Sequence, residues 1–274
     1  MTNWWRNIEW AAIVVMLLGF LAAWKWSWFS DHAARRPGWV LVLEIALVVI
    51  FLVTFGKSND GTLLGVLIDE ADRVSLGRLQ MFLWIVVLYA GLATALTVNL
   101  ARDCRTYPEG TDPPAGKCAE SIFSIEVPTD MLKLVGITMA SGAVSGLVIF
   151  QGLNRTPRAS VRDRGAEQLD GTDYEARGII AARPEATEAT LADTMRGSFV
   201  TDAPALDLSK VQFLVLTLLL AGAYLVAFAQ GMSTDVSTPL GSFPAFDDGL
   251  INLLAISAAA YAGIKVLKDA SLSG

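Results

Sequence analysis

Long apolar stretches separated by polar segments run the length of this chain. A helix that crosses the roughly 30 Å hydrocarbon core of a bilayer needs about 20 apolar residues, each rising about 1.5 Å. The stretches that meet this requirement are residues 10–29, 39–55, 79–99, 131–151, 211–230 and 250–267. The pattern predicts an all-α integral membrane protein with about six transmembrane helices, surrounded by the lipid bilayer.

Composition supports a membrane protein and narrows the function. Hydrophobic residues make up 53% of the 274 positions and charged residues 18%, against about 25% charged residues in ordinary soluble chains. The net charge of −6 gives no reason to expect a nucleic-acid partner. One histidine and two cysteines cannot form a His/Cys metal cluster, and Walker, dinucleotide-binding, HExxH and GxSxG motifs do not occur. We therefore expect no enzyme activity and no cofactor.

The distribution of Lys and Arg predicts the orientation of the helices. With the N-terminus inside, 14 of the 21 Lys and Arg residues belong to cytoplasmic segments and 5 to outer loops. Cytoplasmic loops of membrane proteins carry an excess of basic residues. We therefore expect both termini inside and residues 30–38, 100–130 and 231–249 outside.

Both cysteines, Cys104 and Cys118, fall in the predicted outer loop between the third and fourth helices. Cysteines outside the cytoplasm are commonly oxidised, and closing a loop of about 15 residues contributes roughly 3 kcal/mol in the chain-entropy treatment. The sequence predicts a Cys104–Cys118 disulfide, with two unpaired thiols as the alternative.

Two charges interrupt the first two apolar stretches. Lys25 and Glu44 lie about 6 Å and 7.5 Å below the predicted outer ends of antiparallel helices, so they have similar depths. A single charge at this depth is costly, and pairing lowers the cost. We expect an ion pair between Lys25 and Glu44; the alternative is a Lys25 side chain that reaches the headgroups alone.

An internal repeat is the most informative feature of the sequence. The motif S-L-G-R-L-Q recurs 132 residues later as D-L-S-K-V-Q, each time just before an apolar stretch. The first residue suits an N-cap, the basic residue suits the cytoplasmic headgroups, and the glutamine should face protein. The residues in these roles are Ser75, Arg78 and Gln80 in the first copy and Asp207, Lys210 and Gln212 in the second.

The repeat predicts the organisation of the chain. Residues 1–56 form an N-terminal hairpin, and residues 57–151 and 207–274 form two repeated hairpins that both enter from the cytoplasm. Such parallel repeats are related by an axis along the membrane normal. The 152–206 segment between them is a cytoplasmic loop; its polar composition predicts flexibility in its first half, and residues 190–196 suit a short helix.

These motifs resemble those of a group of bacterial polytopic membrane proteins to which no activity is attached. The similarity covers roughly residues 62–151 and 190–267. It rests on residues 75–84 and 207–212, on Gly136-Ile137-Thr138 in the fourth apolar stretch and on its counterpart Ala255-Ile256-Ser257 in the sixth. It departs at Leu216, where we expect a tryptophan like Trp84. The resemblance implies a multi-pass protein of the bacterial cytoplasmic (inner) membrane and implies no reaction.

Small residues recur at helical spacing in the fourth and sixth apolar stretches. They allow close helix packing, either between the two hairpins or between subunits, and the hydroxyl-bearing members also suit a pore lining. These positions are Gly136, Thr138, Ala140, Ser141, Gly142, Ser145, Gly146, Ala255, Ala259 and Gly263. Two hypotheses follow: a non-enzymatic membrane scaffold, anchor or sensor that engages a cytoplasmic protein partner, and alternatively a homo-oligomeric ion channel or small-solute pore.

Overall fold

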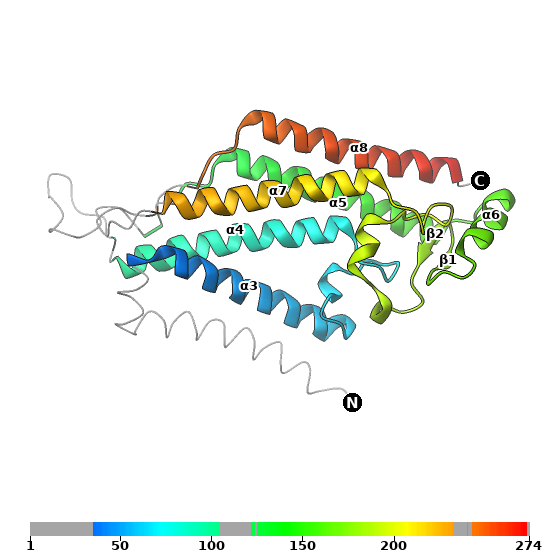
Figure 1. The fold of residues 1–274 in the computed structure, drawn as a ribbon, viewed down its shortest axis with the longest axis horizontal. Coiled ribbons are helices and arrows are strands. Elements are labelled where there is room, and N and C mark those ends of the chain that lie inside the picture. The colour runs from blue at the N-terminus through cyan, green and yellow to red at the C-terminus, as the bar shows by residue number, and fades with distance from the viewer. Residues whose placement is uncertain are drawn as a thin grey trace. The chain divides into compact units, whose positions relative to one another are not determined.

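The protein is predominantly helical in a computed structural model, which describes residues 35–102, 104, 122–123, 125–232, 240 and 243–272, without the side chains of 58–60. Within these residues, five helices are long and apolar enough to cross a membrane (Figure 1). They are α3 (Pro37–Asp60), α4 (Leu76–Ala101), α5 (Thr129–Leu153), α7 (Leu208–Gly231) and α8 (Asp248–Leu272). This confirms a helical, membrane-embedded protein. The expected helix at 10–29 lies outside the described residues, so the count of six stays a prediction.

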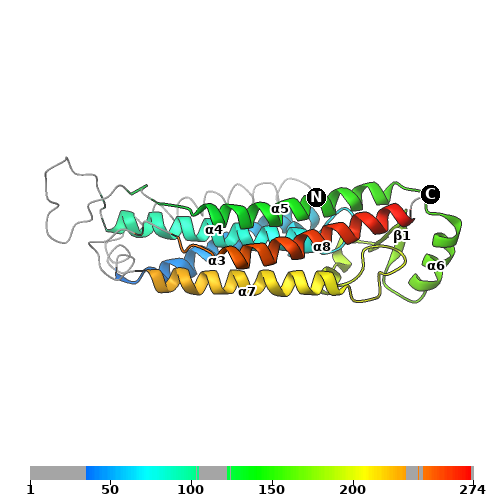
Figure 2. The same cartoon turned by 90° about the horizontal axis from the view of Figure 1, so that it is seen from above.

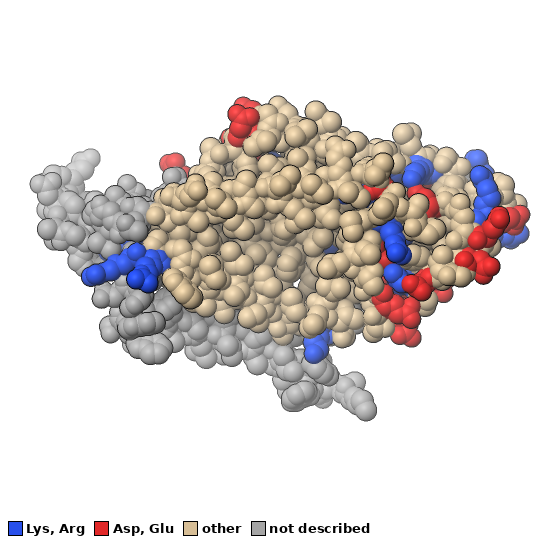
Figure 3. All heavy atoms as spheres, viewed as in Figure 1, with Lys and Arg blue, Asp and Glu red and all other residues tan. Residues whose placement is uncertain are grey.

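The surfaces of these helices suit lipid. Large apolar side chains on four of them are more than half exposed, which water would disfavour but lipid tails accommodate. Examples are Ile50 at 61%, Leu147 at 60%, Leu219 at 66% and Ile256 at 67% exposure. On the face shown in Figure 3, charged side chains lie away from the middle of the helices.

The helix starts follow from local chemistry. Pro37 opens α3, where its missing N–H costs nothing because the first N–H groups of a helix have no partner. The carboxylate of Asp207 caps α7 by accepting from the backbone N–H groups of Ser209 (3.1 Å) and Lys210 (3.4 Å). The predicted cap is therefore confirmed for Asp207. Ser75 precedes α4, but its hydroxyl makes no capping hydrogen bond within the described residues.

The chain divides into two compact units. One unit comprises the described parts of residues 1–54, 84–132 and 220–245. In it, the amide of Asn99 at the end of α4 exchanges two hydrogen bonds with the backbone of Leu240, at 2.8 and 3.3 Å. The ring of Phe243 stacks on Phe228 with centroids 4.9 Å apart. These contacts fix the returning chain against the helices of this unit.

The other unit comprises residues 55–83, 133–219 and 246–274, and it holds all the small elements. The short 3-10 helix η1 (Gly65–Leu67) precedes α4. The 152–206 segment, which follows α5, forms α6 (Ala159–Leu169), strands β1 (Glu175–Arg177) and β2 (Ile180–Ala182), and the 3-10 helices η2 (Ala186–Glu188) and η3 (Leu191–Met195). Figures 1 and 2 show α6 and the strands together beyond the end of α5.

Strands β1 and β2 pair antiparallel, with Arg177 opposite Ile180. Gly178 takes the first position of the turn with φ +62°, a conformation that glycine adopts without strain. A Cβ at this position would also lie 2.3 Å from the carbonyl oxygen of Gly152. The turn therefore needs glycine twice over, for its own geometry and for its close approach to the end of α5.

The polar composition of the 152–206 segment predicted that its first half is flexible. In the structure, this half is folded like the rest of the segment. Its few apolar residues gather with residues from the helix ends into one core, and this burial offsets the entropy that a polar segment loses on ordering. The core contains Ala71, Val148, Ile149, Val161, Leu169, Tyr174, Ile179, Ile180, Ala181, Ala182, Phe199, Val200, Ala203 and Leu272. The short helix expected at 190–196 is present as η3, with a capping box between Thr190 and Asp193.

The small residues of α5 and α8 fall into two groups. Gly142 packs against Gly77 of α4, where a Cβ on Gly77 would lie 2.7 Å from the Cα of Gly142. By contrast, four of the small residues expected to pack between the two hairpins are exposed in the single chain: Gly136, Ala140, Ala259 and Gly263. Close packing therefore occurs between α4 and α5, at a glycine pair of which the sequence pattern singled out Gly142 but not Gly77.

Candidate functional site: three buried cations beside one cavity

Lys210, the basic residue of the second repeat motif, is buried at 4% exposure. Its ammonium donates to the carbonyl oxygen of Arg196 at 2.5 Å and to the hydroxyl of Ser198 at 2.8 Å. The expectation that Lys210 reaches the headgroups is therefore wrong, because the folded 152–206 segment covers it. Its counterpart Arg78 is partly exposed and binds the carbonyl oxygen of Ile68 and, at 2.7 Å, Glu70.

Arg73 is a second buried cation, also 4% exposed, and a tight turn before α4 positions it. The carboxylate of Asp69 accepts the backbone N–H groups of Ala71 (3.0 Å) and Arg73 (3.4 Å), which closes the turn. The Arg73 guanidinium donates to the carbonyl oxygen of Ala181 at 3.2 Å and lies 4.6 Å from the centre of the Tyr174 ring. It therefore joins the turn to the 152–206 segment.

Lys265 of α8 is the third buried cation, at 4% exposure. Its ammonium donates to the hydroxyl of Ser145 in α5 and lies 5.1 Å from the centre of the Tyr261 ring. The Ser145 and Tyr261 hydroxyls are 2.8 Å apart. Ser145, expected to pack helices or line a pore, is thus fully buried in a polar network. Thr138 and Ser141 are buried as well and donate to carbonyl oxygens of their own helix.

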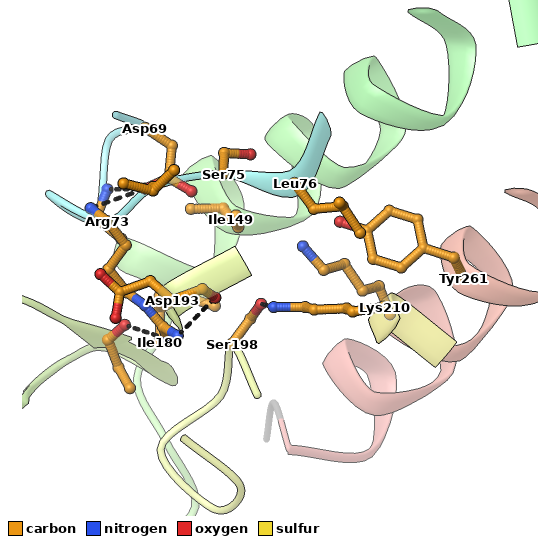
Figure 4. Close-up of a pocket in the computed structure, with 14 residues that line it drawn as sticks. Asp69, Arg73, Ser75, Leu76, Ile149, Ile180, Asp193, Ser198, Lys210 and Tyr261 are labelled. Carbon is orange, nitrogen blue, oxygen red and sulfur yellow. Dashed lines mark hydrogen bonds between the residues drawn. The ribbon is translucent and has the colours of Figure 1, made fainter. Parts of the chain in front are cut away.

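Arg73, Lys210 and Lys265, named here the cation cluster, line one cavity (Figure 4). The cavity has room for about one water molecule. Within the part of the chain that the structure describes, none of the three forms a salt bridge, since no carboxylate oxygen lies within 4.0 Å. Removing a charge from water costs on the order of several kcal/mol, so this arrangement calls for a compensating group.

The carboxylates around the cavity have partners of their own. Asp193 is bound by Arg183 at 2.9 Å, by the Tyr174 hydroxyl at 2.5 Å and by the Thr190 N–H at 2.9 Å. Burial opposes ionisation of Asp193, but these hydrogen bonds outweigh it and lower the pKa of the carboxyl. Burial raises the pKa of Asp69, against the hydrogen bond from Ala71 and the charges of Lys265 and Arg73.

The cation cluster is rich in N–H donors and in positive charge. Buried Lys and Arg side chains present N–H donors and positive charge, and both suit an anion. Among the described residues, no three His, Cys, Asp or Glu side chains gather in a way that would hold a metal ion. Two of the three cations also contact serine hydroxyls, Lys210 at Ser198 and Lys265 at Ser145.

Gln80 and Gln212 differ in their surroundings. Gln80 is 1% exposed and donates to the hydroxyl of Thr217 in α7 at 2.8 Å, so it faces protein as expected. Gln212 is exposed and donates to the hydroxyl of Ser257 in α8 at 3.3 Å. The first copy of the motif thus places its glutamine in the protein interior and the second places it at the surface.

The two predicted outer features lie partly outside the described residues. Cys104 is 1% exposed and is not a free thiol, but Cys118 is not described, so the pairing stays a prediction. Glu44 is buried at 6% exposure and accepts from the Thr97 hydroxyl at 3.3 Å. Its expected partner Lys25 is likewise outside the described residues.

The sequence carried only part of the signal for the cation cluster. Lys265 interrupts an apolar stretch, and an ionisable residue there is a recognised mark of function. Arg73 carried no such mark, because it lies in a polar turn. No family model, curated protein or solved structure matches the chain, so the interpretation of the site rests on its geometry.

Proposed function

We propose that this protein is a non-enzymatic membrane scaffold of the bacterial cytoplasmic membrane, whose 152–206 segment holds a cytoplasmic protein partner. One observation carries the proposal: this segment and the helix ends share one hydrophobic core. Val148 and Ile149 of α5 and Leu272 of α8 pack in the same cluster as Val161 of α6 and Phe199. A segment built into the helix ends is a fixed platform, whereas a flexible loop would not be.

Polar contacts reinforce the connection between the segment and the helices. The backbone N–H of Ile179 donates to the carbonyl oxygen of Gly152 at 3.1 Å, and that of Arg183 to Ala71 at 3.0 Å. Lys268 of α8 forms a salt bridge with Asp202 at 2.5 Å. Because main-chain bonds and ion pairs join the same elements as the core does, motion of the segment relative to the helix ends is restrained.

The outer face of α6 is the surface that we assign to the partner. Val161, Gly165 and Leu169 are buried, so this helix has a defined inner side. Its outer side is exposed and charged: Arg158, Arg162, Asp163, Arg164 and Glu167. The one salt bridge found among them, Arg162–Asp163, is weak at 3.9 Å, with both side chains more than 70% exposed. These charges are therefore available to another molecule.

Capture of a partner tests this proposal. The full chain in lipid nanodiscs is incubated with cytosol of the source cells, and bound protein is quantified against Arg164→Glu. Lys57→Glu is the matched control, because it makes the same charge change at an exposed position at the end of α3. We expect a stoichiometric partner that Lys57→Glu retains and Arg164→Glu loses. Absence of a stoichiometric partner would contradict the scaffold.

A homo-oligomeric pore is the second candidate, and the exposed small residues favour it. Gly136, Ala140, Ala259 and Gly263 are exposed in the single chain, where another helix could approach closely. Liposome flux and mass analysis in detergent separate the two functions. Ion-selective flux by a defined oligomer would favour the pore, and a partner without flux would favour the scaffold.

A further inference from the structure

The cation cluster has more N–H donors than acceptors. An ammonium group carries three N–H donors and a guanidinium five. Lys265 uses one donor, for Ser145, and Lys210 uses two, for Arg196 and Ser198. Arg73 uses two, for the backbone of Ala181 and Asp193. Each of these residues is more than nine-tenths buried and borders the cavity, and their remaining donors have no hydrogen-bond partner among the described residues.

Charge leads to the same conclusion as the donor count. The ammonium of Lys210 is repelled by Lys265 and Arg73 and attracted by Asp207 and Asp202. Both attracting carboxylates are engaged elsewhere: Asp207 caps α7, and Asp202 is paired with Lys268 at 2.5 Å. The three like charges therefore share a small cavity in which, among the described residues, no carboxylate oxygen lies within 4.0 Å of any of them.

Two carboxylates border the cavity and work against an anion there. Asp69 directs one oxygen to the N–H groups of Ala71 and Arg73, within its own turn. Asp193 is held by Arg183 and by the Tyr174 hydroxyl. Neither carboxylate forms a salt bridge with the cluster, so the donors of the cluster stay available.

We propose that the cation cluster binds one small inorganic anion of the halide class, with chloride as the physiological ligand. Room for about one water molecule is nearest in size to a monatomic ion. Chloride is somewhat larger than water and requires a small shift of the lining, whereas a phosphate group requires a much larger one. The anion accepts from the ammonium groups of Lys210 and Lys265 and neutralises their repulsion. Because these residues come from α7 and α8 and Arg73 precedes α4, the anion joins the starts of two helices to the end of a third. This site does not depend on the proposed scaffold function.

Chloride binding to the purified full chain tests the proposal directly. Equilibrium dialysis with radioactive chloride should give saturable binding of one ion per chain. Thermal unfolding at constant ionic strength should show a higher midpoint in sodium chloride or bromide than in sodium gluconate, whose anion is too large for the cavity. Both measurements use the unaltered protein, so they decide the matter even if a variant fails to fold.

Substitutions then locate the ion. Lys265→Met removes a cluster cation, while Lys57→Met removes an equal charge from an exposed position at the end of α3. Loss of a charged hydrogen bond should weaken chloride binding about tenfold or more in Lys265→Met, and Lys57→Met should bind as the unaltered protein does. The proposal would be overturned if the protein showed no saturable chloride binding or if the two variants bound chloride equally. It would also be overturned if phosphate or anionic lipid, and not halide, stabilised the protein. Partner capture can fail while chloride binds, so the two proposals are separable.

Discussion

Arg183 and Asp193 form a buried salt bridge of 2.9 Å, in which the side chains are 5% and 0% exposed. Asp193 also caps η3, and the Arg183 guanidinium lies 4.5 Å from the centre of the Tyr174 ring. This pair therefore connects the β-hairpin to η3 inside the 152–206 segment. Its geometry leads to the first two predictions.

Removal of the cation should unfold the segment. Arg183→Met leaves the Asp193 charge buried without its partner, which typically costs about 3–5 kcal/mol. We expect a loss of this size in the free energy of unfolding, measured by denaturant titration in mixed micelles, together with faster proteolysis of residues 152–206. Arg164→Met on the exposed side of α6 is the control and should change stability by less than about 0.5 kcal/mol. Equal effects of the two variants would disprove the role of the pair.

Acid should weaken the same region in a defined direction. The folded-state pKa of Asp193 is lowered from its ordinary value of 3.8. Its contribution to stability is therefore fully present above about pH 4 and is lost as the pH falls through the folded-state pKa. Asp193→Asn should start less stable at pH 7 and show a flatter decline between pH 5 and pH 2 when unfolding is followed by tryptophan fluorescence. A parallel decline in both proteins would show that another group is responsible.

The contact between α4 and α5 should not tolerate a side chain at Gly77. A Cβ there would lie 2.7 Å from the Cα of Gly142, and backbone cannot move aside as a flexible side chain can. We expect Gly77→Ala to destabilise the protein by about 1–3 kcal/mol, the usual cost of overpacking. Gly146→Ala is the control, because its Cβ would meet nothing within 4 Å. A thermal midpoint unchanged by Gly77→Ala would contradict this close approach.

Gln80 and Thr217 should be energetically coupled across α4 and α7. Their side chains are 2.8 Å apart and almost fully buried. Measured couplings of this kind in membrane proteins average about 0.6 kcal/mol and reach about 1.7 kcal/mol. A double-mutant cycle of Gln80→Leu and Thr217→Val should return a value in this range. Strict additivity of the two substitutions would show that the hydrogen bond contributes nothing.

The outer loop should be closed by a Cys104–Cys118 disulfide. Non-reducing peptide mapping of the protein in intact membranes should recover the two cysteines in one linked fragment. Reduction should lower stability by roughly 3 kcal/mol, because it releases a loop of about 15 residues in the unfolded chain. Recovery of both thiols free would contradict the pairing and the outside location of this loop.

The sequence by itself determined the membrane helices. The apolar stretch at 79–99 corresponds to α4 at Leu76–Ala101, and the stretch at 211–230 to α7 at Leu208–Gly231. A stretch of about 20 apolar residues in lipid can satisfy its backbone hydrogen bonds within itself only as an α-helix. The local composition is therefore sufficient to predict these helices. The cap at Asp207 was equally local, because a capping carboxylate acts on N–H groups two and three residues away.

Tertiary structure alone decided the 152–206 segment and the cation cluster. The two strands of the 152–206 segment are three residues long each, which is too short for a periodic pattern in the sequence to identify them. Two hydrogen bonds of the cluster join residues that are 120 positions apart in the sequence. They run from Arg73 to the backbone of Asp193 and from Lys265 to Ser145. Whether a lysine near a helix end reaches water or is buried depends on what folds over it. For Lys210 the covering residues come from a separate part of the chain, and no local pattern encodes that contact.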